Sequence, residues 1–185
     1  MEPPRHLAGH VRGADGAEPD PRDCRHRRDP CEGPPLGDWA KRGAYLQAIG
    51  ASRGGRTTKI HALSDEAGRP RVLLLTAGNI ADVSVAAALI RRTGPFTRLL
   101  ADRGYDARHL RELIAERGAE AVIPSTRSRK RPIPHNANAY RARNLAERLW
   151  CRLKDWRRLA TRYDKLASNY LATALIAATI TYWCN

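Results

Sequence analysis

The sequence has few cysteines, and their arrangement excludes a zinc-binding or disulfide-rich domain. The four cysteines are Cys24, Cys31, Cys151 and Cys184. Their spacing matches no zinc pattern, and no signal peptide precedes them. We therefore expect reduced thiols in a cytoplasmic protein. Cys24, His26 and Cys31 lie near one another in the sequence, but this spacing does not favour a metal site.

Long hydrophobic runs are also absent. The apolar run near the C-terminus, Leu171–Trp183, is shorter than the about 20 residues that a helix needs to span a bilayer. We expect no membrane partner and interpret this run as a buried core helix.

Acidic residues are scarce beside the basic ones. The chain has 19 Asp and Glu against 33 Lys and Arg, which gives a net charge of +14. Such an excess attracts polyanions and weakens as salt is added, so nucleic acid is the expected partner. Arginine suits bidentate phosphate contacts. A GC-rich genome would also raise the arginine content, and both explanations remain open.

The chain divides by composition into two parts. Residues 1–40 are rich in Pro, Gly, Arg and Asp and show neither a helical nor a strand period. Such a segment cannot bury enough apolar surface to offset its ordering entropy, so we expect it to be disordered or unrelated to the rest. Residues 41–185 are long enough for one domain with its own core.

Within the second part, strands come first and then alternate with helices, which predicts a mixed α/β sheet. The expected strands are 57–63, 71–76, 98–101 and 121–123, the first two joined as a hairpin by a turn over 64–70. The expected helices are 82–92, which Asp82 would cap, and 107–117, which Gly118 would end. A long helical region follows the basic loop 124–138, with a break near 161–164.

The most informative segment is Tyr140–Lys154. On a helix, Arg143, Glu147, Trp150 and Lys154 would share one face, opposite an apolar face. The residues of that apolar face are Leu145, Leu149, Leu153 and Trp156. One carboxylate between cations could hold a metal ion against a phosphate backbone. A solvated ladder of ion pairs is the alternative.

A second segment ends a predicted strand with the sequence Asp102-Arg103-Gly104-Tyr105-Asp106. Carboxylates at the ends of buried parallel strands often lie where ligands bind. For Asp106 we favour capping of the following helix, which it directly precedes. For Asp102, at the strand end, we favour a catalytic role over capping.

These segments together resemble the catalytic domain of DDE transposases of bacterial insertion sequences, in particular the insertion sequence 5 family within the insertion sequence 4 group. The resemblance rests on residues 50–61, 100–106, 122–124 and 157–165, and on the Tyr140, Arg143, Glu147 and Lys154 spacing. It implies a ribonuclease-H-like α/β fold, Mg²⁺ or Mn²⁺ as cofactor, and double-stranded DNA, both transposon ends and target, as partner. It also implies a nucleoid-associated protein, and a homodimer on DNA is one possible arrangement.

The resemblance further implies roles for individual residues. Asp102 and Glu147 correspond to the second and third acids that hold the metal ions and carry catalysis. Tyr140, Arg143 and Lys154 would contact DNA near the cleavage point. The basic run Arg127, Arg129, Lys130 and Arg131 would also touch phosphates, with a solvated loop as the alternative. The Gly-rich stretch 52–56 is interpreted as a basic turn and not as a phosphate cradle.

The first acid of the family has no counterpart in this sequence. In the family it lies on a strand upstream of the Gly-rich segment, and we expect no such strand before Gly50. The fold would then lack its first strand. The chain would be a truncated or frameshifted copy of a transposase, inactive in strand transfer. A non-catalytic DNA-binding remnant and a metal-dependent nuclease of the same fold are the two alternatives.

Overall fold

The computed structural model describes residues 6–8, 14–16, 47–52 and 55–184, and these form two compact units. The first unit comprises residues 1–13, 61–74 and 81–151, and the second comprises 14–60, 75–80 and 152–185. The elements in chain order are β1 His6–Ala8, β2 Ala14–Gly16, β3 Gly50–Ser52, β4 Gly55–Asp65, β5 Pro70–Ala77, α3 Asp82–Arg92, β6 Arg98–Leu100, η1 Arg103–Tyr105, α4 Arg108–Glu116, β7 Glu120–Val122, α5 Ala137–Tyr140, η2 Arg141–Arg143, α6 Asn144–Lys154, α7 Arg157–Ala160 and α8 Ala167–Trp183.

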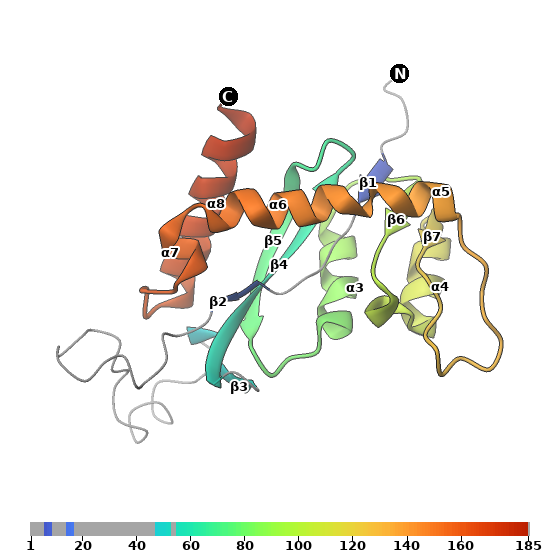
Figure 1. The fold of residues 1–185 in the computed structure, drawn as a ribbon, viewed down its shortest axis with the longest axis horizontal. Helices are drawn as coiled ribbons and strands as arrows, with labels where there is room; N and C mark the ends of the chain where they lie inside the picture. Colours follow the sequence, from blue (N-terminus) through green and yellow to red (C-terminus); the bar gives the residue numbers. More distant parts are fainter. Residues whose placement is uncertain (1–5, 9–13, 17–46, 53–54, 185) are drawn as a thin grey trace. The chain divides into compact units, whose positions relative to one another are not determined.

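The sheet of the first unit is mixed. Strand β6 pairs in parallel with β7 on one side and with β1 on the other, and β1 pairs antiparallel with the end of β4 (Figure 1). The register joins Leu7 to Leu99 and to Asp65. The prediction of a mixed α/β fold is confirmed. The prediction that no strand precedes Gly50 is wrong, because β1 and β2 lie there; the rest of residues 1–40 falls outside the described residues.

Helices α3 and α4 bury one face each against this sheet. Leu89 and Ile90 of α3 and Leu110 and Ile114 of α4 are at most 1% exposed and pack with Leu99 of β6. Their spacing of one to four residues puts these side chains on a single stripe of each helix. The core of the first unit therefore holds β6 rigidly, and with it the residue that follows the strand.

The second unit combines the outer part of β4 with the C-terminal helices. Strands β2 and β3 both pair antiparallel with β4. Tyr170 of α8 is fully buried and donates its hydroxyl hydrogen bond to the Leu159 carbonyl at 2.9 Å. The Trp156 indole N–H donates to Thr181 Oγ1 at 3.0 Å. These contacts tie α7 to α8.

The predicted core helix near the C-terminus is buried on one side only. Tyr170, Ala174 and Ala177 have no exposed surface, whereas Leu175 and Ile176 are 48% and 58% exposed. The expectation of a buried helix is thus wrong for that second side. Among the described residues, no helix is long and apolar enough to cross a membrane.

Most predicted boundaries agree with the structure to within two residues. The hairpin of β4 and β5 turns through Gly68, whose φ of +77° favours glycine, and Gly118 ends α4 with φ of +68°. The predicted face of α6 is wrong for Trp150, which is 6% exposed and packs in the core beside Leu149. Ala81, not Asp82, is the N-cap residue of α3.

Gly78 offers a test of this packing. A Cβ at this position would lie 3.0 Å from the Thr57 carbonyl oxygen and closer still to the Thr57 hydroxyl, whereas a Cβ at Gly94 would meet nothing within 4 Å. We expect Gly78→Ala to lower the free energy of unfolding by about 1–3 kcal/mol, because it overpacks a buried backbone contact. Urea denaturation of both variants measures the difference. Gly94→Ala is the control, and an equal effect of both substitutions would contradict the prediction.

Candidate active site

Asp102 stands where a buried strand ends. It follows β6 and Ala101, both held in the core, and its backbone opens the short helix η1. Its side chain is 29% exposed, so the carboxylate lies at the surface end of a rigid element. The position agrees with the predicted placement of Asp102 at the end of a parallel strand.

Tyr140 reaches the same carboxylate from a distant part of the chain. Its hydroxyl donates to Asp102 Oδ1 at 3.3 Å, and its ring lies edge-on to His135 at 5.6 Å. The Asn136 side chain caps α5 by accepting from the Ala139 N–H at 3.0 Å, which fixes the short helix that carries Tyr140. Burial, and then the charge of Asp102, raise the pKa of Tyr140 above its ordinary value, so the hydroxyl keeps its proton at neutral pH.

Arg143 joins the two acids. One terminal nitrogen, Nη1, lies 3.0 Å from Asp102 Oδ1, and the other, Nη2, lies 2.6 Å from Glu147 Oε1. The guanidinium carbon also lies 5.8 Å from the centre of the Tyr140 ring. The predicted Arg143–Glu147 pair is therefore present, and the structure extends it: a single guanidinium bridges Asp102 and Glu147.

A hollow of about 620 Å³ opens beside this constellation. Its walls include Asp82, Asp102, Tyr105 and Tyr140. Tyr105 is 3% exposed, and its buried hydroxyl finds no hydrogen-bond partner among the described residues. Burial first, then the charges of Asp82 and Asp102, raise the pKa of Tyr105 far above its ordinary value. The hollow is thus lined by two carboxylates, those of Asp82 and Asp102, by Arg103, and by the two tyrosines.

The donor set suits a single divalent cation better than a pair. Carboxylate oxygens are the ligands that Mg²⁺ prefers, and Asp102 and Glu147 supply them. In the described part of the chain, however, no group of three or more His, Cys, Asp or Glu side chains is placed to hold a metal ion. Two carboxylates that share one guanidinium are one acid short of the set that the family resemblance implies.

Asp106 does not cap helix α4, which corrects the prediction. The N-cap residue is Ala107, with no side-chain hydrogen bond. The Asp106 carboxylate is fully buried and accepts from Arg111 Nε at 2.8 Å and from Arg129 Nε and Nη2, each at 2.8 Å. It also accepts from the Thr126 N–H at 2.8 Å. Asp106 therefore anchors the basic loop after β7 to the domain.

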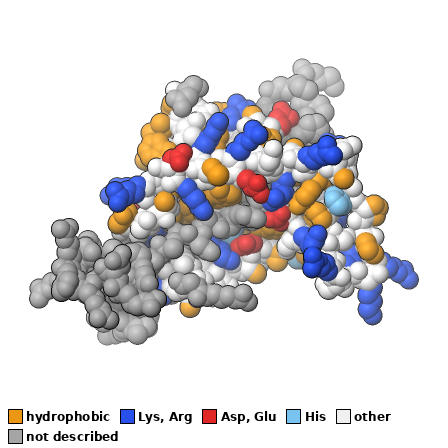
Figure 2. All heavy atoms as spheres, in the orientation of Figure 1, with side chains coloured by type: hydrophobic (Ala, Val, Ile, Leu, Met, Phe, Trp, Pro, Cys, Tyr) orange, Lys and Arg blue, Asp and Glu red, His pale blue; other side chains and the backbone are white. Residues whose placement is uncertain are grey.

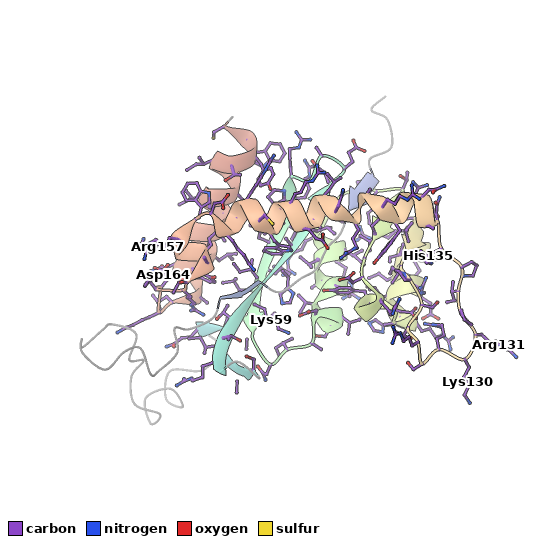
Figure 3. The ribbon with its side chains drawn as sticks, viewed as in Figure 1. Lys59, Lys130, Arg131, His135, Arg157 and Asp164 are labelled. Atoms are coloured by element: carbon purple, nitrogen blue, oxygen red, sulfur yellow. The ribbon has the colours of Figure 1, made fainter. Side chains whose placement is uncertain are left out.

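The basic side chains of the loop after β7 differ in their surroundings: one is in an ion pair with Asp106, and three are exposed to solvent. Arg129 is bound to Asp106, with its side chain 25% exposed, and its contact with DNA stays a prediction. Arg127, Lys130 and Arg131 are exposed. Lys130 and Arg131 point away from the ribbon at the outer edge of the loop (Figure 3), where Lys and Arg side chains project from the surface (Figure 2).

Lys154 is the one predicted site residue that belongs to the second unit. It is the last residue of α6 and is exposed. Arg143, Tyr140, Asp102 and Glu147 all belong to the first unit, which brings these four together.

Known proteins resemble most of this chain. Residues 24–182 match the family described as "Transposase DDE domain". The chain belongs to this family of transposases. It is 32% identical over 124 residues to the "Putative transposase for insertion sequence element IS6501" of Brucella ovis, which covers 65% of this chain and 94% of that protein.

A second relative is the "Putative transposase for insertion sequence element IS402" of Burkholderia cepacia. It is 29% identical over 137 residues, which is 68% of this chain and 63% of that protein. The chain thus spans less than two thirds of this relative's length. No solved structure matches the chain significantly.

The family match begins at residue 24 and leaves strand β1 outside it. The sequence around β1 contains no acidic residue between Glu2 and Asp15. The strand that pairs between β4 and β6 therefore supplies no carboxylate beside Asp102.

The sequence did not predict that Asp82 and Tyr105 line the hollow. It also did not predict that Asp106 anchors the basic loop. The sequence does carry a signal for Tyr105, because an aromatic residue lies between Asp102 and Asp106 in an expected turn. No local pattern links Asp106 to Arg129, because they are separated by 23 residues.

The Asp106 network predicts a pH-dependent contribution to stability. Burial alone would raise the pKa of Asp106, but hydrogen bonds from Arg129, the Thr126 N–H and Arg111 outweigh it and hold the pKa well below its ordinary value. A lowered pKa in the folded state means that the stabilisation is complete above about pH 4 and is lost as the pH falls further. We expect Asp106→Asn to cost about 3 kcal/mol at pH 7, because it removes the buried anion that Arg111 and Arg129 bind.

Urea unfolding of both proteins at pH 7 and at pH 3 measures this effect. The difference between wild type and Asp106→Asn should narrow at pH 3. Glu112→Gln is a suitable control, because Glu112 pairs with the exposed Arg108 on the same helix face. A difference that stays constant with pH would contradict the assignment.

Proposed function

We propose that this chain is an insertion-sequence transposase, of the insertion sequence 5 branch within the insertion sequence 4 group, that binds DNA but does not complete strand transfer. The observation that carries the proposal is the convergence of Asp102 and Glu147 on the Arg143 guanidinium, with the Tyr140 hydroxyl donating to Asp102. In this family an acid pair of this kind holds the metal ion that activates the attacking oxygen, and the proposal places Asp102 and Glu147 in that role.

The strand arrangement supports a ribonuclease-H-like fold. β4 is antiparallel to β1, while β1, β6 and β7 run parallel, and β5 pairs with the outer side of β4. Asp102 then lies at the carboxyl end of a parallel strand, the edge at which α/β sheets bind ligands.

Charge supports double-stranded DNA as the partner, both transposon ends and target. The net charge of +14 and the exposed Arg127, Lys130 and Arg131 favour phosphate contacts. Tyr140 can stack on a base or donate a hydrogen bond, and Lys154 can neutralise a further phosphate. Binding to chromosomal DNA would associate the protein with the nucleoid. The protein would bind there as a single copy or as a homodimer.

The missing acid supports an inactive copy. In-line attack on a phosphodiester uses two divalent ions, about 3.5–4 Å apart, to activate the nucleophile and stabilise the leaving oxygen. Asp102 and Glu147 can hold at most one of them, with Mg²⁺ or Mn²⁺ supplying Lewis-acid chemistry when bound. We attribute the loss to a truncation or frameshift upstream of Gly50, so that residues 41–185 are the C-terminal part of the catalytic domain.

Cleavage of a labelled duplex that carries the element's own ends tests the proposal. We expect salt-sensitive binding in the presence of Mg²⁺ or Mn²⁺, without strand-transfer products, because the two-metal site is incomplete. Cleavage that Glu147→Gln abolishes would instead support an active enzyme. Cleavage without joining would support a nuclease, and absence of binding would contradict the proposal altogether.

The salt dependence of binding tests the role of the loop. Replacing Lys130 and Arg131 with Ala should weaken DNA binding and reduce the slope of log K against log salt by about 0.9 for each phosphate that the variant no longer neutralises. Fluorescence anisotropy over a range of salt concentrations measures the slope. Arg108→Ala removes one positive charge from a residue that pairs with Glu112, and it should leave the slope unchanged. Equal slopes for all variants would show that the loop does not touch DNA.

A further inference from the structure

We propose that the corner formed by α7 and the link to α8, residues 157–165, binds the phosphate backbone of double-stranded DNA. The inference rests on the proposed function, because it takes duplex DNA as the ligand. It deepens that function by adding a second contact surface: the corner belongs to the second unit, whereas the basic loop 124–138 belongs to the first.

The corner is strongly basic. It contains four basic residues and one acidic residue, which are Arg157, Arg158, Arg162, Lys165 and Asp164. Arg157, Arg158 and Lys165 are exposed, and within the described part of the chain none of the three forms an ion pair. Exposed cations without an acidic partner leave their charge available to a polyanion.

The link between α7 and α8 turns its one acid inward. The cap residues at both ends of the link are extended, and successive side chains of an extended chain point to opposite sides. Arg162 and Asp164 are partly buried, and the Asp164 Oδ2 atom is fully buried. Tyr163 is 48% exposed, and Lys165 is exposed as well. A tyrosine and a lysine therefore face solvent on the side away from the acid.

One buried tyrosine holds the corner in place. The Tyr170 hydroxyl donates to the Leu159 carbonyl of α7 at 2.9 Å, and the Arg162 guanidinium carbon lies 5.2 Å from the centre of the Tyr170 ring. Arg162 in turn donates from Nε to the Asp164 carbonyl at 2.8 Å and from Nη2 to the Lys165 carbonyl at 3.0 Å. Both α7 and the link are thus fixed to the same ring. Little backbone freedom is lost when a ligand binds to such a surface.

The exposed side chains suit phosphate oxygens. The planar forks of Arg157 and Arg158 can each bind a phosphate through two parallel hydrogen bonds. Lys165 adds a compact positive charge, and the Tyr163 hydroxyl can donate a further hydrogen bond. Contacts to phosphates position a protein on a duplex without reading its bases. We therefore expect the corner to bind duplexes of unrelated sequence equally well.

Lysine acylation followed by mass spectrometry tests the inference on the unaltered full chain. We expect a DNA duplex to slow the acylation of Lys165 severalfold at low salt, because bound phosphates cover its ammonium group. The protection should disappear at high salt. Lys130 in the basic loop reports on the proposed function in the same sample. An unprotected Lys165 would overturn the inference, and protection of Lys130 in that sample would leave the proposed function intact. Protection of Lys165 alone would support the inference and contradict the role of the loop.

A double substitution measures the contribution of the two arginines. Arg157→Ala combined with Arg158→Ala should weaken duplex binding about tenfold at physiological salt, and it should reduce the slope of log K against log salt by about 0.9 for each lost phosphate contact. Arg91→Ala combined with Arg92→Ala is the matched control, because these are also adjacent exposed arginines, in the last turn of α3 in the first unit. The control should leave the slope unchanged. Equal losses in the two double variants would refute the inference, since only net charge would then matter.

Discussion

The bridge from Arg143 to Asp102 and Glu147 is the interaction on which the site depends. It joins the end of a core strand to a helix that comes 41 residues later in the chain. Without a cation between them, the two carboxylates would repel each other. The guanidinium offsets this repulsion and links the two acids through one side chain.

A second ion-pair network determines where the surrounding cations lie. The buried Asp106 carboxylate binds Arg111 and Arg129 and so fixes the loop that displays Arg127, Lys130 and Arg131 outward. Two acidic residues that are close in the sequence therefore have different roles. Asp102 lines the hollow, and Asp106 anchors the basic loop through its ion pairs. Their different burial separates these roles, since a fully buried carboxylate needs fixed donors whereas a half-exposed one can exchange its partner.

Much of the fold could be predicted from hydrophobic periodicity. The hairpin of β4 and β5, helices α3 and α4 and the break before α8 all lie close to their predicted bounds. Trp150 was misplaced because an i, i+7 spacing puts it near the edge between the charged and apolar faces, where packing decides. β1 was missed because three residues within a polar segment carry no period of their own; its partners Leu99 and Asp65 supply the pairing.

Family membership could be predicted from the sequence, and so could the positions of Asp102 and Glu147, since the Arg143–Glu147 spacing of one helical turn and the strand end at Asp102 are local features. Only the tertiary structure decided that one guanidinium serves both acids, that the buried Asp106 pairs with Arg129, and that β1 brings no carboxylate to the site. Local patterns act within a turn of helix or a run of strand. Contacts between residues tens of positions apart depend on how the core places the helices and strands that carry them. The spacing of residues in the sequence does not determine that placement.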